Sequence, residues 1–171
     1  MNEADKKLAL DCLYYEFWVL KGSYDFLSRK PILSIEKNIG LESFLVHVRN
    51  IVYFLENNKY ESDIRCSDFG ITKVKVVLPV DNDLIKIDKY LSHLTKERMS
   101  NQKPEWKCGK IKNIVEKELM FFLNKVPESL KNYFLEKMNS EASDENIISK
   151  SIITSTSSDM DPVHRLKFFG E

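Results

Sequence analysis

The sequence predicts an all-α fold, an up-and-down helical bundle of about four main helices plus a short fifth helix. Apolar residues recur at spacings of three and four along most of residues 1–138. Only five glycines and five prolines interrupt this pattern, too few for a loop-rich β-sandwich, and 171 residues with 43% hydrophobic content are enough for one core. We therefore expect a helical bundle domain over residues 1–138 and a Ser/Thr-rich flexible tail over residues 139–171.

The first two helices are expected over residues 4–27 and from Ser34 to about residue 56, with Ser34 as the N-cap. Pro31 separates them, because proline disfavours helical geometry in the residue before it. The second helix has the most regular apolar stripe of the chain: Leu41, Phe44, Leu45, Val48, Ile51, Val52 and Leu55. Gly40 costs about 1 kcal/mol relative to Ala inside a helix, so a bend or a later helix start remains open.

Residues 71–80 alternate and are rich in β-branched side chains, which locally indicates a strand. A strand without a partner is unstable, and Pro79 weakens the assignment further. We expect an extended connection, with a short hairpin arm as the alternative.

Three more helical patterns follow. The third runs from a cap at Asp81 or Asp83 to about Met99, and the fourth from Trp106 to Asn124. Pro127 opens the short fifth helix, which ends near Met138, because proline is tolerated in the first helical turn.

The composition changes after residue 138. Nine of the twenty-two residues from Ser140 to Asp161 are Ser or Thr, which predicts a flexible tail. The stretch from Pro162 to Phe169 is apolar again and is a candidate to dock on the body or on another subunit.

Bulk composition excludes several classes of protein. The 26 basic residues balance 26 acidic ones, so overall charge gives no footprint for nucleic acid, although a local patch remains compatible with this balance. Cys12, Cys66 and Cys108 are odd in number and widely spaced, which favours reduced thiols over a disulfide framework or a zinc site. No signal-peptide core and no apolar run of about 20 residues occurs, so we expect a cytoplasmic protein without a membrane span. Phosphate-loop, dinucleotide-binding and metalloprotease motifs are also missing, and no cofactor or metal is expected.

Two polar clusters stand out on otherwise apolar helices. The first contains Glu42, His47 and Arg49. At about 100° per residue, Glu42 and Arg49 fall on one side of the apolar stripe and His47 on the other. They therefore flank different interfaces of that helix, unless they form only a solvated border with an incidental histidine.

The second cluster contains His93 and Arg98. Arg98 projects onto the apolar face of its helix, and a buried guanidinium needs an acceptor, for which Glu42 is the preferred partner. The alternatives are a structural ion pair with an exposed histidine, or an Arg98 head that reaches water at the helix end.

Four aromatic residues follow closely in the first helix: Tyr14, Tyr15, Phe17 and Trp18. Such rings can stack on bases. Their helical setting makes them core residues instead.

These clusters carry a resemblance to a group of bacterial helical proteins. The shared pattern is Glu-Ser-Phe-Leu-x-His-x-Arg-Asn at residues 42–50, Asp-Phe at 68–69, Asp-Lys-x-x-x-His-Leu-Thr-x-x-Arg at 88–98, and Lys-x-x-Trp at 103–106. More distantly, the chain is similar to the HEPN superfamily of helical bundles from bacterial defence and toxin systems. That resemblance implies a HEPN-like bundle and, for many members, a metal-independent RNase with its site at a dimer interface.

One departure from the HEPN pattern bears on activity. HEPN nucleases carry an Arg four to six residues before a His on one helix, and no Arg stands at that distance before His47, His93 or His164. A nuclease would use His93 as general acid or base and Arg49 or Arg98 as the phosphate-binding cation, with His47 as a further candidate.

The sequence therefore leaves two functions open, and with them the question of whether the protein is an enzyme. The first is a bundle that acts through dimerisation or protein partners, with a role in bacterial defence or stress as the resemblance implies. The second is a metal-independent RNase or nucleotide-binding enzyme whose partner is RNA.

Overall fold

The structure is a computed structural model that describes residues 1–29, 33–57, 60, 62–79, 84–92 and 104–140. Regular structure within these ranges is helical, with no strand, and this part of the chain confirms the all-α prediction. The chain divides into two compact units, Met1–Glu136 and Lys137–Glu171. The helices described below belong to the first unit unless stated otherwise.

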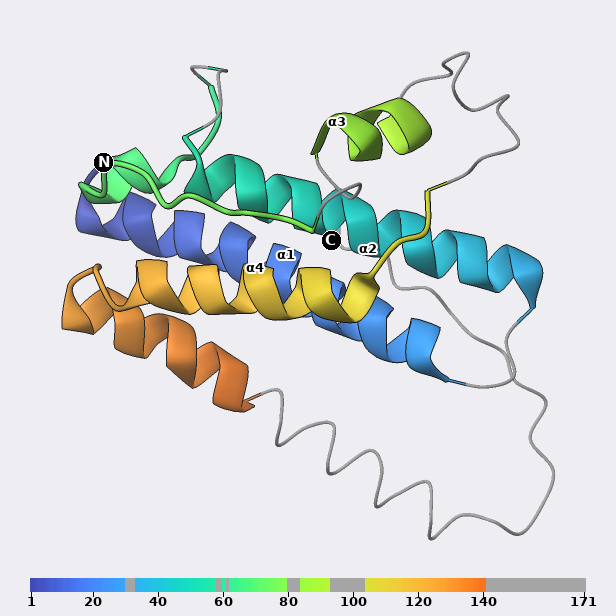
Figure 1. The fold of residues 1–171 in the computed structure, drawn as a ribbon. Helices are drawn as coiled ribbons and strands as arrows, with labels where there is room; N and C mark the ends of the chain where they lie inside the picture. Colours follow the sequence, from blue (N-terminus) through green and yellow to red (C-terminus); the bar gives the residue numbers. More distant parts are fainter. Residues whose placement is uncertain (30–32, 58–59, 61, 80–83, 93–103, 141–171) are drawn as a thin grey trace, which may run out of the picture. The chain divides into compact units, whose positions relative to one another are not determined.

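Helix α1 (Glu3–Ser28) and helix α2 (Ser34–Leu55) make the most extensive helix–helix contact and lie side by side (Figure 1). The Asn2 side chain caps α1 by accepting a hydrogen bond from the Asp5 backbone N–H at 2.8 Å. The buried residues of α1 are Ala9, Leu10, Leu13, Phe17, Leu20 and Ser23. Phe17 is a core residue as predicted, but Tyr15 and Trp18 are 55% and 47% exposed, so that prediction was wrong for them.

The apolar stripe of α2 is confirmed, since six of its members are buried and only Leu41 is half-buried. The helix begins at Ser34 as expected, but its N-cap is Leu33 and not Ser34, and the Leu33 N–H donates to the Glu36 carboxylate at 2.9 Å. A later start at Gly40 is therefore wrong. A Cβ added at Gly40 would lie 2.8 Å from Cδ1 of Phe26, so glycine permits the close approach of α1 and α2.

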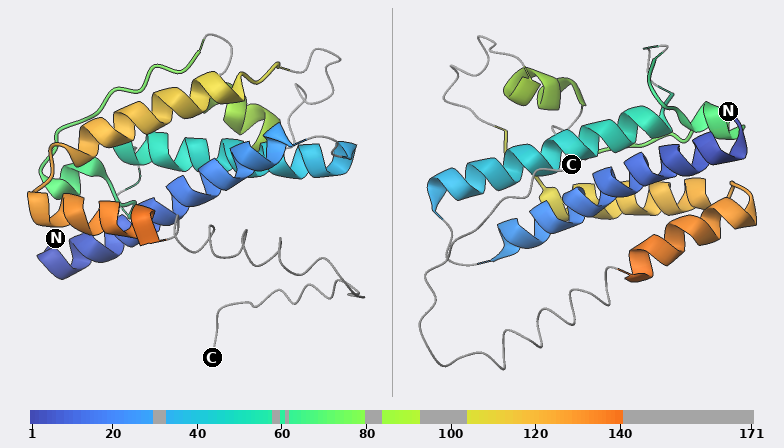
Figure 2. Two further views of the ribbon diagram at one scale, coloured as in Figure 1. Left: turned by 90° about the horizontal axis from the view of Figure 1, so that it is seen from below. Right: turned by 180° about the vertical axis from the view of Figure 1, so that it is seen from behind.

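Helix α4 (Cys108–Leu123) packs against both α1 and α2 (Figures 1 and 2). It begins two residues later than predicted. Its Phe122 ring meets Phe54 and Phe69 edge to face, at centroid distances of 4.9 and 5.4 Å. Residues 128–140 are helical as well and end two residues further than predicted; the last four of them belong to the second unit. Phe134 packs edge-on against Tyr14 at 5.6 Å.

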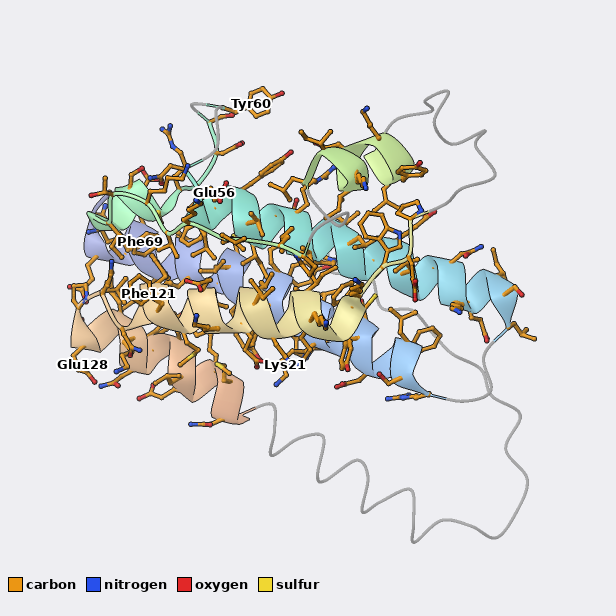
Figure 3. All side chains as sticks on the ribbon, in the orientation of Figure 1. Lys21, Glu56, Tyr60, Phe69, Phe121 and Glu128 are labelled. Carbon is orange, nitrogen blue, oxygen red and sulfur yellow. The ribbon has the colours of Figure 1, made fainter. Side chains whose placement is uncertain are left out.

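Between α2 and α3 the chain forms one short 3₁₀ helix, η1 (Cys66–Phe69), which the sequence analysis missed, and an extended connection. Described residues 71–79 contain no strand, in agreement with the predicted extended connection. Val74 N–H donates to the Leu55 carbonyl at 2.9 Å, and Val76 N–H donates to the Glu56 carboxylate at 3.0 Å. Figure 3 shows Tyr60 projecting away from the body, where it is 60% exposed.

The described part of the third predicted helix comprises α3 (Leu84–Ile87) and a π-helical turn, η2 (Asp88–Ser92). Ile87 is fully buried, and α3 packs against α2. The expected caps Asp81 and Asp83 and the end at Met99 lie outside the described residues.

Candidate functional site

Two carboxylates from other elements are held by side chains of α2. Glu16 comes from α1, and Asp88 comes from η2. Each of them accepts two hydrogen bonds from α2. We refer to Glu16, His47 and Asn50 as the Glu16 cluster, and to Asp88, Arg49 and Tyr53 as the Asp88 cluster.

In the Glu16 cluster one carboxylate oxygen takes both bonds. Glu16 Oε2 lies 2.6 Å from Nδ1 of His47 and 3.0 Å from Nδ2 of Asn50. Because a carboxylate only accepts, Nδ1 of His47 carries the proton of this hydrogen bond. The side chains of His47 and Glu16 are 13% and 24% exposed, and the Tyr15 ring stands edge-on to the imidazole at 5.9 Å. The cluster thus ties α1 to α2 at a half-buried position.

In the Asp88 cluster each carboxylate oxygen accepts a hydrogen bond from a different donor. Arg49 Nη1 donates to Oδ1 at 3.1 Å, and the Tyr53 hydroxyl donates to Oδ2 at 2.8 Å. Burial and the hydrogen bond to Asp88 raise the pKa of Tyr53 from 10.0 to about 12. The phenol therefore stays protonated, and remains a donor to Asp88, across the neutral range.

His47 and Arg49 contact different neighbours of α2, as the helical rotation of the sequence predicts. His47 bonds to α1, whereas Arg49 bonds to η2. The structure therefore does not bring these two candidate residues into one cleft, and each is engaged by a carboxylate. Their catalytic roles stay predictions.

Glu42 belongs to neither cluster. Its side chain is exposed and borders a cavity of about 210 Å³. The residues that line it come from α2, η2 and the segment before α4: Asn38, Leu41, Glu42, Tyr90, Leu91, Pro104 and Trp106. Arg98, the preferred partner of Glu42, and His93 lie outside the described residues. The Arg98–Glu42 ion pair thus stays a prediction.

The Cys66 thiol lies in a polar contact network at the end of α2. It donates to the Leu55 carbonyl and to Oδ1 of Asn57, each at 3.1 Å. Asn57 adopts a left-handed φ of 56°, and its Oδ1 also accepts from the Ser67 N–H at 2.9 Å. Burial raises the pKa of Cys66, so the thiol form predominates. This network stabilises the turn after α2.

An apolar groove of about 340 Å³ runs between α1 and α2 at the end where α1 finishes and α2 begins. It is lined by Trp18, Val19, Gly22, Ser23, Phe26, Ile39, Gly40 and Ser43. Ser23 and Ser43 are joined by a hydrogen bond of 2.8 Å between their hydroxyls. Ile39, on the α2 side, is 61% exposed.

Sequence reasoning missed three members of the clusters. Glu16 carries a visible signal, as the only charged residue within an aromatic run of the first helix, from Tyr14 to Trp18. Tyr53 stands one helical turn after Arg49, and Asp88 opens the third of the four patterns quoted above, at residues 88–98. No pattern in the sequence pairs Glu16 with His47 and not with another base.

Comparisons with protein-family models, with curated proteins and with solved structures give no significant match. The resemblances drawn from the two polar clusters therefore remain proposals. None of the helices among the described residues has both the length and the hydropathy needed to cross a bilayer. Within the same residues, no group of three or more His, Cys, Asp or Glu side chains is placed to hold a metal ion.

Proposed function

We propose that this protein is an up-and-down, HEPN-like helical bundle that acts as an interaction module and dimerises through the solvent face of α1. The observation that carries the proposal is a run of unburied residues along α1 and at its C-cap, Arg29, at alternating spacings of three and four. We call this run the α1 stripe: Asp5, Leu8, Cys12, Tyr15, Val19, Gly22, Phe26 and Arg29. Such spacing is that of a coiled-coil seam.

Large apolar side chains are exposed on this face of α1. Leu8 is 64% exposed, Tyr15 55% and the adjacent Trp18 47%. Fully burying one such side chain stabilises by about 1.5–3 kcal/mol, and contiguous exposed apolar patches mark protein interaction sites. The groove between α1 and α2 continues this patch onto a second helix.

The charges of the stripe favour a second copy of the chain as the occupant. Its first residue, Asp5, is acidic, and its last, Arg29, is basic, while every residue between them is uncharged. A surface with opposite charges at its two ends is complementary to itself. The ion pair of Arg49 with Asp88 also favours association over catalysis, because the guanidinium is already bound to a carboxylate.

The test compares two substitutions at sites of nearly equal exposure. Leu8 lies in the α1 stripe and is 64% exposed, whereas Ile85 lies on α3 and is 65% exposed. Sedimentation equilibrium over a concentration series should give a dimer for the wild type and for Ile85→Glu, and a monomer for Leu8→Glu. Circular dichroism should show unchanged helicity in both variants. A wild type that stays monomeric, or a dimer that survives Leu8→Glu, would overturn the proposal.

A metal-independent RNase is the second candidate function. The observation in its favour is the carboxylate on Nδ1 of His47, an arrangement that orients a histidine as a general base. Under this alternative His47 or His93 exchanges the proton, and Arg49 or Arg98 holds the phosphate. RNA cleavage should then persist in EDTA, depend on pH near the ordinary histidine pKa of about 6.5, and fall about 10²–10⁴-fold in His93→Ala or His47→Ala. A protein that leaves RNA intact would remove this candidate.

A further inference from the structure

We infer that two copies of the chain pair their α1 stripes antiparallel, around a two-fold axis that passes between Tyr15 and Val19. The inference rests on the proposed homodimer and adds its orientation and register. In this register Tyr15 of each copy faces Val19 of the other. The further pairs of the stripe are Cys12 with Gly22, Leu8 with Phe26 and Asp5 with Arg29, and each pair occurs once on either side of the axis.

The register matches side chains by size. Leu8 faces Phe26, so an exposed aliphatic side chain meets a half-buried ring. Cys12 faces Gly22, so two small residues meet one helical turn nearer the axis and allow the helices to approach closely. A parallel pairing would set Gly22 against Gly22 directly beside Phe26 against Phe26, which alternates a gap with a bulky contact.

The register also matches charge. Asp5 of each copy faces Arg29 of the other, so an opposite-charge pair closes the interface at both ends. In a parallel arrangement Asp5 would face Asp5 and Arg29 would face Arg29. Because like charges placed opposite each other are repulsive, the charges select the antiparallel orientation.

The groove between α1 and α2 brings residues of α2 into the proposed interface. Gly22 and Phe26 belong both to the α1 stripe and to the lining of the 340 Å³ groove, which Ile39 of α2 completes. Leu8 of the second copy, placed over Phe26, comes to lie at this groove. Its exposed side chain thereby gains apolar contacts from α2 as well as α1.

Disulfide trapping with Gly22→Cys tests the register. A Cβ added at Gly22 meets no atom within 4 Å, so the protomer accommodates the new side chain. In the antiparallel dimer the introduced thiol faces Cys12 of the second copy. Mild oxidation of Gly22→Cys should therefore give a disulfide-linked dimer on a non-reducing gel, with peptides around residues 12 and 22 joined in the mass spectrum.

Two controls define the result. The wild type should not cross-link through Cys12, because the two Cys12 residues lie ten positions apart along the seam, about 15 Å at 1.5 Å per residue. Disulfides need Cα atoms within about 7 Å. Gly22→Cys combined with Cys12→Ser should also stay uncross-linked.

Three results would overturn the inference, and they separate it from the proposed function. Cross-linking of the wild type through Cys12 would indicate a parallel dimer or an antiparallel dimer centred on Cys12, and a sedimenting dimer of Gly22→Cys without the disulfide would indicate another register. Both would leave the homodimer standing. Monomeric wild type and monomeric Gly22→Cys would overturn the register and the homodimer together.

Discussion

Removing the Tyr53 hydroxyl tests the Asp88 cluster. In Tyr53→Phe the phenol–carboxylate hydrogen bond of 2.8 Å is lost, while the Arg49 contact at 3.1 Å remains. Hydrogen bonds to charged groups contribute about 1.5–3 kcal/mol. The Asp88 side chain is 33% exposed, so a water molecule can donate to it in place of the phenol and reduce the loss of stability. We therefore expect a decrease in the free energy of unfolding at the low end, about 1.5 kcal/mol, measured by urea denaturation at pH 7.

The same variant has a defined pH dependence. The folded Tyr53 has a pKa of about 12 and the unfolded tyrosine one of 10.0. A raised folded pKa contributes stability below pH 10 that is lost as the pH rises toward 12. The difference between these two pKa values corresponds to at most about 2.7 kcal/mol of unfolding free energy. Because Tyr53 is only half-buried, solvent screening lowers this contribution to about 1 kcal/mol. The stability difference between wild type and Tyr53→Phe should therefore shrink above pH 10.

A matched control is Tyr133→Phe, which removes another hydroxyl bound at 2.8 Å to a carboxylate, Asp11. Tyr53→Phe should couple to Asp88→Asn in a double-mutant cycle, whereas Tyr133→Phe should be additive with it, because the Tyr133 hydroxyl bonds to Asp11 and not to Asp88. A Tyr53→Phe variant as stable as the wild type, or a stability difference that stays constant above pH 10, would refute the reasoning.

Three further predictions concern stability and thiol reactivity. Leu45→Ala should lower the free energy of unfolding by about 2–5 kcal/mol in urea, because Leu45 is fully buried. Glu16→Gln should cost about 1–3 kcal/mol in the same assay, since one oxygen of Glu16 accepts two hydrogen bonds; no loss would show that water replaces them. A thiol reagent should label the fully buried Cys66 only as the protein unfolds; labelling of Cys66 in the folded protein as fast as in urea would contradict its burial.

The sequence predicted α2 better than α1, for a physical reason. On α2 the apolar residues from Leu41 onward lie mostly on one stripe, so helical periodicity alone identifies the buried face there. On α1 they occupy the solvent face as well, and Leu8, Tyr15 and Trp18 fit the same spacing as the buried Leu10 and Leu13. Periodicity cannot decide which of two apolar faces meets a neighbour, because that depends on where the other helices pack.

The candidate site was predictable only in part for a related reason. The positions of His47 and Arg49 on opposite flanks of α2 follow from helix geometry alone. The partner of His47 lies thirty-one residues earlier, on α1. Which acid reaches it depends on how the two helices slide along each other, and the close contact of Gly40 with Phe26 helps to fix that register. The sequence does not encode such a contact in any local pattern.

The remaining acid of the first polar cluster, Glu42, has a separate prediction. Glu42 and Trp106 both line the cavity of about 210 Å³. The Glu42 side chain is exposed, so it needs a cation as a partner to have a structural role. If Arg98 supplies that cation, a double-mutant cycle of Arg98→Met and Glu42→Gln should give a coupling well above the 0.2–1 kcal/mol that is typical of exposed pairs, about 2 kcal/mol. Glu36→Gln, which removes a carboxylate at the start of the same helix, is the control and should be additive with Arg98→Met. A coupling near zero would show that Glu42 is not the partner of Arg98. Another acid would then have to accept from the guanidinium that the sequence predicts on the apolar helix face.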